Sequence, residues 1–270
     1  MKRTLLIPTD FDQYAPMIME FCAGTRERGI VKCILLHVID TSGMESPVLA
    51  RAMEEGYERL DKLSAPLRAS GIEVTTRIET GERTHEILRV AAQDNVDVVV
   101  MGLTRKAAPR RFFEGSTSDS VVYRQKVATL LVRDDILAAS RDPKQLSLEW
   151  SKSLVVPVDY SAPSARAVLQ CTRFEADAVG EVRLLHVLDP KHLSSEDARR
   201  RAIEENTFRL SAFGSMLEDI GISATPVVRI GESVHDEILS EIAESASSGV
   251  VLGVRGRGAL AKLVLGSVSH

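Results

Sequence analysis

The chain repeats one domain-length pattern. The segment TLLIPTDFD at 4–12 returns as SLVVPVDYS at 153–161, and LLHVID at 35–40 returns as LLHVLD at 184–189, in both cases 149 residues later. Farther on, VVMG at 99–102 returns as VVLG, 151 residues later. A drift of only two residues across the repeat indicates a duplicated domain of about 150 residues, a period too long for a solenoid.

Each copy alternates short apolar runs, typical of strands buried on both faces, with helical patterns. This alternation predicts two doubly wound α/β domains with parallel sheets, at 1–133 and 152–270, joined by a charged linker at 134–151. The second domain is expected to lack its last helix and fifth strand, because His270 corresponds to position 119 of the first copy. Asp12 and Ser161 are predicted N-caps. In the first copy the expected strands are 4–8, 31–39, 72–78, 96–101 and 127–132, and the expected helices include 45–70, 82–93 and 115–124.

Composition excludes several classes of protein. A net charge of −4 leaves no electrostatic case for a nucleic-acid partner. No apolar run approaches the roughly 18 residues of a membrane span. The three cysteines have no metal-like spacing, so we expect a reduced, cytoplasmic protein.

Glycines follow the fourth predicted strand of each copy. The second copy reads Gly253-x2-Gly256-x9-Gly266-Ser267, and the first reads Gly102-x2-Arg105-x9-Gly115-Ser116. Glycine lets a ligand approach the backbone, and Gly-Ser before a helix leaves free N–H groups as a seat for phosphate. Asp10 and Asp159 follow the first strands. If the first and fourth strands are neighbours, both features face one crevice, where open parallel sheets bind ligands.

The combination resembles the universal stress proteins in their tandem two-domain form, over almost the whole chain. The residues that carry the resemblance are PVD at 157–159, HV at 186–187 and the glycine pattern, which matches the ATP-binding signature of that family. The resemblance implies ATP or AMP as the ligand, with or without Mg²⁺, and a homodimer. The implied site in the second copy is Pro157, Val158, Asp159, Val187, Gly253, Gly256, Gly266, Ser267, Val268 and Ser269. The weaker site in the first copy is Thr9, Asp10, Val38, Gly102, Arg105, Gly115, Ser116 and Thr117.

Arg105 departs from the family pattern, which has glycine there. Its side chain would fill space that a ribose or phosphate needs, which favours a weakened site in the first copy. The alternative is that its guanidinium itself meets a phosphate. His37 and His186 recur at one position, which indicates a structural role.

No catalytic constellation is visible, because Ser267 has no paired base. We therefore expect a nucleotide-dependent regulator or interaction module of the stress response, with slow hydrolysis at most. The alternative is a nucleotide-free scaffold of the same fold. An enzyme of the wider adenine-nucleotide α/β group is the third reading. No nucleic acid or membrane is expected as a partner, and the sequence does not identify a protein partner.

Overall fold

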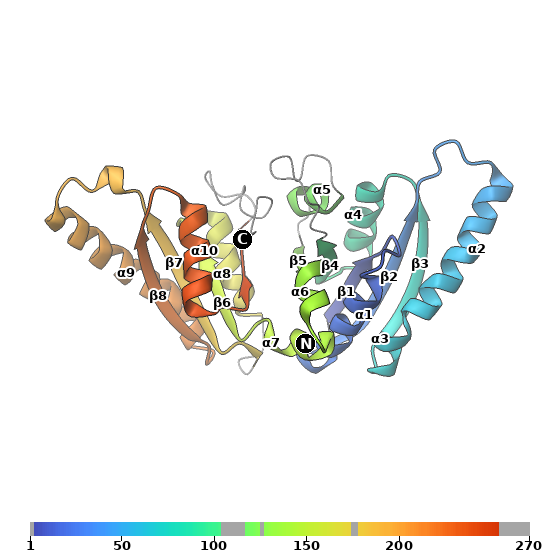
Figure 1. Ribbon diagram of the computed structural model, residues 1–270, viewed down its shortest axis with the longest axis horizontal. Coiled ribbons are helices and arrows are strands. Elements are labelled where there is room, and N and C mark those ends of the chain that lie inside the picture. The colour runs from blue at the N-terminus through green and yellow to red at the C-terminus, as the bar shows by residue number, and fades with distance from the viewer. Residues whose placement is uncertain (1–2, 104–116, 125–126, 174–177, 254–270) are drawn as a thin grey trace. The chain divides into compact units, whose positions relative to one another are not determined.

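The computed structural model describes residues 3–103, 117–124, 127–173 and 178–253 (Figure 1). The chain divides into two compact units, Met1–Leu148 and Glu149–His270. The stretch predicted as a linker, 134–151, carries helices α6 (Asp134–Ala139) and α7 (Pro143–Glu149). Leu137 of α6 is fully buried. The domain limits inferred from the sequence stay a prediction.

The first unit has a five-stranded parallel sheet in the order β3-β2-β1-β4-β5. This sheet confirms the predicted doubly wound arrangement, in which successive strands are added on one side and then, after a crossover, on the other. The strands are β1 (Arg3–Pro8), β2 (Ile30–Ile39), β3 (Glu73–Thr80), β4 (Val98–Leu103) and β5 (Ala128–Arg133).

The helices of the first unit begin and end close to the predicted limits, with two differences. The single helix expected over 45–70 is divided at Ser64, because Pro66 has no N–H to donate to the preceding turn. The first helix begins at Ala15 and not directly after Asp12, although the Asp12 carboxylate accepts hydrogen bonds from the backbone N–H groups of Tyr14 and Ala15, both 2.9 Å. The helical elements are α1 (Ala15–Gly24), η1 (Thr25–Arg28), α2 (Ser46–Leu63), α3 (Ala65–Ala69), α4 (Arg83–Gln93) and α5 (Thr117–Arg124).

The second unit repeats this order of elements. Its described residues form a four-stranded parallel sheet, β8-β7-β6-β9. Helix α9 runs unbroken, because Met216 occupies the position that Pro66 has in the first unit. The elements are β6 (Ser153–Pro157), α8 (Ala162–Cys171), β7 (Glu181–Leu188), η3 (Pro190–His192), α9 (Glu196–Glu218), β8 (Ser223–Ile230), α10 (Val234–Ser245) and β9 (Gly249–Val250).

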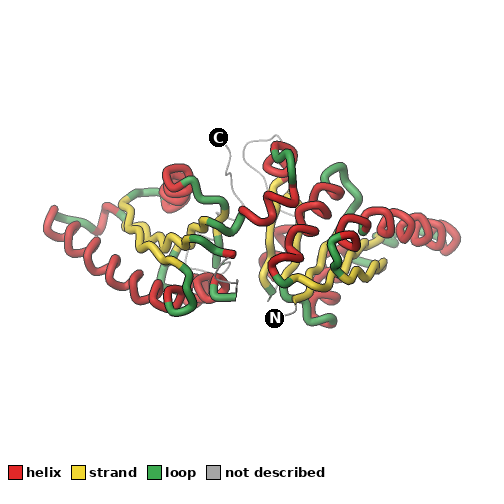
Figure 2. Tube along the Cα trace, turned by 90° about the horizontal axis from the view of Figure 1, so that it is seen from below, coloured by secondary structure: helices red, strands yellow, loops and turns green. Residues whose placement is uncertain are grey.

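Both faces of each sheet are covered by helices, and alternation along the strands divides the core in two (Figure 2). In β6, Leu154 and Val156 pack in the cluster that includes Leu210 of α9. Val155 points to the other face, where it packs with Ile238 of α10. Successive side chains of a strand point to opposite faces, so a central strand buried on both sides must be apolar throughout.

Candidate functional site

In each unit the first and fourth strands are hydrogen-bonded neighbours. β1 pairs with β4 and β6 pairs with β9, both in parallel. The residues that follow β1 and β6, Asp10 and Asp159, therefore lie at the same sheet edge as Gly102 and Gly253. The winding of the sheet reverses between these strands, which is where open α/β sheets bind ligands. The sequence predicted one shared crevice if the first and fourth strands are neighbours, and they are neighbours in both units.

The aspartate of this edge is built into the turn that starts the next helix. The Asp159 carboxylate accepts hydrogen bonds from the backbone N–H of Ser161, at 3.0 Å, and from the Ser161 hydroxyl. The Ser161 oxygen in turn accepts from the N–H of Ser164, at 3.4 Å, which confirms it as the N-cap of α8. In the first unit Asp10 accepts from the N–H of Asp12 at 3.3 Å.

The residue after each aspartate has a left-handed backbone. Phe11 has φ 62° and Tyr160 has φ 59°, a conformation that aromatic residues adopt only where their surroundings impose it. An arginine guanidinium over the ring and a tilted histidine ring contact each of these aromatic side chains, an arrangement called the stack below. The guanidinium of Arg209 lies 3.7 Å from the centre of the Tyr160 ring, and the ring of His186 packs against that tyrosine at 4.7 Å between centroids. This stack fixes the turn on which the aspartate sits.

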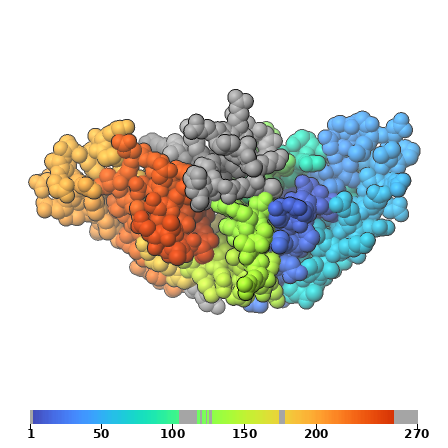
Figure 3. Space-filling model, viewed as in Figure 1, coloured from blue at the N-terminus to red at the C-terminus, as the bar shows by residue number. Residues whose placement is uncertain are grey.

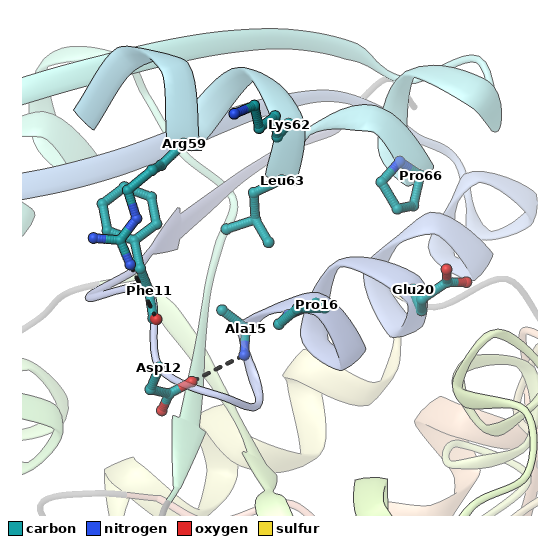
Figure 4. A pocket seen from close by; sticks show the side chains of 9 residues that line it. All are labelled: Phe11, Asp12, Ala15, Pro16, Glu20, Arg59, Lys62, Leu63 and Pro66. Atoms are coloured by element: carbon teal, nitrogen blue, oxygen red, sulfur yellow. Dashed lines mark hydrogen bonds between the residues drawn. The ribbon is translucent and has the colours of Figure 1, made fainter. Parts of the chain in front are cut away.

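Arg59, Phe11 and His37 form the same stack in the first unit. The distances are 4.1 Å from guanidinium to ring centre and 4.5 Å between ring centroids. Sequence reasoning missed both stacks, although Arg59 and Arg209 recur 150 residues apart and so carried a detectable signal. Figure 4 shows Arg59 over Phe11 at one end of a hollow of about 360 Å³ between α1 and the α2–α3 segment.

The histidines tie the second strand of each sheet to the aspartate turn. Nδ1 of His186 lies 2.7 Å from the carbonyl oxygen of Val158, and Nδ1 of His37 lies 2.8 Å from that of Thr9. A carbonyl only accepts, so Nδ1 carries the proton. Burial lowers the pKa of both histidines below 6.5, which favours the neutral ring. The predicted structural role of the histidines agrees with these contacts.

The hydrogen bond between His186 and Val158 also shows where the other predicted residues of the site lie. Because Val158 and His186 are joined, Asp159 and Val187 are adjacent across β6 and β7. The Val38 side chain is part of the core that α4 covers, and the Val187 side chain packs toward α10. Pro157 and Val158 are buried. Thr9 accepts a hydrogen bond from the N–H of Phe11 at 3.0 Å, and Thr117 begins α5.

Helix packing accounts for Gly253, which follows β9, and bears less strictly on Gly102, which lies near the end of β4. A Cβ added to Gly253 would lie 2.5 Å from the carbonyl carbon and oxygen of Pro163, at the start of α8. At Gly102 the nearest atom would be Cδ1 of Ile18 in α1, at 2.8 Å. Gly253 therefore sits directly against the helix that Asp159 helps to start, so both parts of the motif lie beside the same helix end. The remaining predicted residues lie outside the described ones: Arg105, Gly115, Ser116, Gly256, Gly266, Ser267, Val268 and Ser269.

Within the described residues, no group of three or more His, Cys, Asp or Glu side chains is arranged to hold a metal ion. No helix in the same part of the chain is long and apolar enough to cross a membrane.

Comparisons with known proteins agree with this architecture. The family model of the universal stress protein family matches residues 1–133 and 151–270. The universal stress protein MJ0577 of Methanocaldococcus jannaschii is 23% identical over 155 residues, which is 49% of this chain and 96% of that protein.

A solved structure shares the fold over most of the chain. A universal stress protein from Archaeoglobus fulgidus DSM 4304 matches with a TM-score of 0.71 at 20% identity, covering 92% of this chain and 85% of its own. A second protein of that family from Archaeoglobus fulgidus, in complex with dAMP, matches 48% of this chain and 96% of its own, with a TM-score of 0.37 and 16% identity. A third, in complex with cAMP, matches 49% of this chain and 97% of its own, with a TM-score of 0.38 and 20% identity. The family model covers both halves of the chain, and each half forms its own parallel sheet with the same strand order. The chain therefore belongs to the universal stress protein family and carries its domain twice.

Proposed function

We propose that this chain is a cytoplasmic regulator that binds an adenine nucleotide, ATP or AMP, at the carboxyl edge of the sheet in its second unit. The nucleotide state alters its association with itself or with another protein. One observation carries the proposal: Asp159 and Gly253 follow adjacent parallel strands, and both lie beside the start of α8. Support also comes from the two solved family members that hold dAMP and cAMP.

The residues at this edge suit the parts of a nucleotide. The Asp159 carboxylate, held in place by Ser161, is an acceptor for the amino group of adenine, beside the main chain of Val187. Gly256 leaves room for the ribose, and the segment 266–269 offers N–H groups and hydroxyls to the phosphates. Any Mg²⁺ would enter with the phosphates, because that ion keeps several waters and binds through substrate oxygens. The site has no assigned acid or base, so the proposal includes slow hydrolysis at most.

Calorimetry with ATP and AMP, together with mass spectrometry of ligand released from the purified protein, tests the proposal. We expect one strong site in the wild-type chain. Gly256→Arg, which copies the residue at position 105 of the first unit, should abolish that binding. The reciprocal change Arg105→Gly should add or strengthen a site in the first unit.

A nucleotide-free scaffold is the second candidate function. The observation in its favour is that helix packing by itself accounts for Gly253, whose added Cβ would meet the backbone of Pro163 and Ser164. This candidate predicts an empty purified protein, no heat with either nucleotide, and no effect of Gly256→Arg on binding or thermal stability. Those results together would replace the nucleotide proposal.

A further inference from the structure

Helix α9 carries an apolar strip on its outer surface. Phe208 is 77% exposed, Ile220 is 42% exposed and Met216 is 38% exposed, and Ala212 between them is also exposed. Leu169 of the adjoining helix α8 is 48% exposed. Phe208, Ala212 and Met216 recur every four positions, so they lie along one side of the helix, and Ile220 follows its C-terminal end. The N-terminal half of α9 (amber) forms part of the surface seen in Figure 3. We call these five residues the α9 strip.

The first unit shows that the fold does not require this strip. Its helices α2 and α3 occupy the place of α9, and their outer positions are mostly polar. Glu58 and Lys62 stand where α9 has Phe208 and Ala212, and Glu20 of α1 stands where α8 has Leu169. Glu20 and Lys62 line the hollow beside Leu63 and Pro66 in Figure 4. At these three positions the two copies of one domain thus differ by exchange of charge for apolar surface, as expected for an interface that only one of them makes, while Met216 and Ile220 correspond to Pro66 and Ser70.

The charges at the two ends of the strip are opposite. With 100° per residue, Arg201, Phe208, Ala212 and Asp219 fall within about 20° of the most outward line of the helix. Arg201 lies at one end of this line and Asp219 lies at the other end. Neither makes an ion pair with another described residue. Along the same line a large side chain, Phe208, is followed one turn later by a small one, Ala212.

We propose that the α9 strip binds the α9 strip of a second copy of this chain, with the two helices antiparallel. When Phe208 of each copy lies over Ala212 of the other, the same register places Arg201 opposite Asp219 of the other copy, twice by symmetry. In this one arrangement a large side chain packs on a small one, and a positive side chain faces a negative one. A two-fold axis closes such a contact into a dimer, because the surface is complementary to itself. The proposal is independent of nucleotide binding.

Sedimentation velocity of the full-length chain over a wide concentration range measures this dimer. We expect a concentration-dependent dimer in the wild type. Phe208→Glu should raise its dissociation constant at least ~20-fold, because a central aromatic residue dominates such an interface. Glu58→Gln, at the matching position of the first unit, should leave the constant unchanged.

Charge reversal tests the orientation. Arg201→Glu alone and Asp219→Arg alone should each raise the dissociation constant roughly fivefold, since like charges then face each other twice. The double variant should return to within about threefold of the wild type. Circular dichroism checks that every variant is folded.

Three outcomes would overturn the proposal. They are a monomer at every concentration, a dimer indifferent to Phe208→Glu, and a double variant no better than its single parents. A dimer that survives Phe208→Glu would assign self-association to another surface, and a monomer would leave the strip to a different partner.

Discussion

Replacing Gly253 by alanine tests the close contact between the loop after β9 and helix α8. The added Cβ would lie 2.5 Å from the carbonyl carbon and oxygen of Pro163 and 2.8 Å from the Ser164 nitrogen. Ordinary contacts are 3.4–4 Å, so backbone must move by about 1 Å. Such overpacking costs about 1–3 kcal/mol. Gly253 does not have a positive φ, so alanine also recovers about 0.4–1 kcal/mol by restricting the unfolded chain.

The net expectation is a loss of about 1–2 kcal/mol in the free energy of unfolding of the second unit. The single tryptophan of the chain, Trp150, packs against the core of that unit and reports its unfolding by fluorescence. With a denaturant slope of about 2 kcal/mol per M, the urea midpoint should fall by roughly 0.5–1 M.

Gly214→Ala is the matched control, because it adds the same methyl group to the same unit. Its Cβ would lie 3.1 Å from Cβ of Ala224 and 3.7 Å from Cδ1 of Leu184, both side-chain atoms, inside a helix where alanine is preferred to glycine by about 1 kcal/mol. Its midpoint should change little. An unchanged or higher midpoint for Gly253→Ala would refute the contact with α8 as the reason for that glycine.

Three further predictions follow from buried groups. Burial lowers the pKa of His186 below 6.5, so the unfolded chain binds more protons than the folded chain as the pH falls through 6.5, and the free energy of unfolding should drop there. Urea midpoints measured across that pH range should depend less on pH in His186→Asn. They should keep the wild-type dependence on pH in His192→Asn, a change at an exposed residue. Arg229→Ala should lower the free energy of unfolding by about 2 kcal/mol, because it removes hydrogen bonds to three glutamates, including Glu241, which is 3% exposed. Arg200→Ala, which removes an exposed ion pair, should lower it by under ~0.5 kcal/mol. Equal losses in the two variants would contradict this ranking. All three cysteine thiols are buried, which raises their pKa, so a thiol reagent should label them at the rate of unfolding; rapid labelling of the native chain would contradict their burial.

Local signals in the sequence sufficed for most of the elements. The expected strands of the first copy overlap β1 to β5, because continuous apolar runs are what strands buried on both faces need. The single helix predicted over 45–70 was wrong at Ser64, where the helix is divided. The helical pattern of apolar residues continues through this point, but Pro66 has no N–H and so removes one helical hydrogen bond. Ser161 was predicted as a cap from its place before Pro163, and its contact with Ser164 confirms it.

The candidate site was only partly predictable, because its contacts join residues far apart in the chain. Asp10, Asp159 and the two described glycines follow from their position after apolar runs. The stacks of arginine on aromatic ring on histidine do not, because they depend on the side-chain positions of α2 and α9 relative to the turn after the first strand. The left-handed φ of Phe11 and Tyr160 likewise has no local signal, since local propensity disfavours it.

The sequence by itself determined that a domain occurs twice, that each copy alternates strand and helix, and which residues follow the first and fourth strands, since periodicity and repetition are properties of the chain. Only the tertiary structure decided that those two strands are neighbours and that Gly253 lies against the start of α8. Strand order also decided which residues share an edge, and it depends on packing between segments about 100 residues apart. That packing brings Asp159 and Gly253 to the start of the same helix, α8.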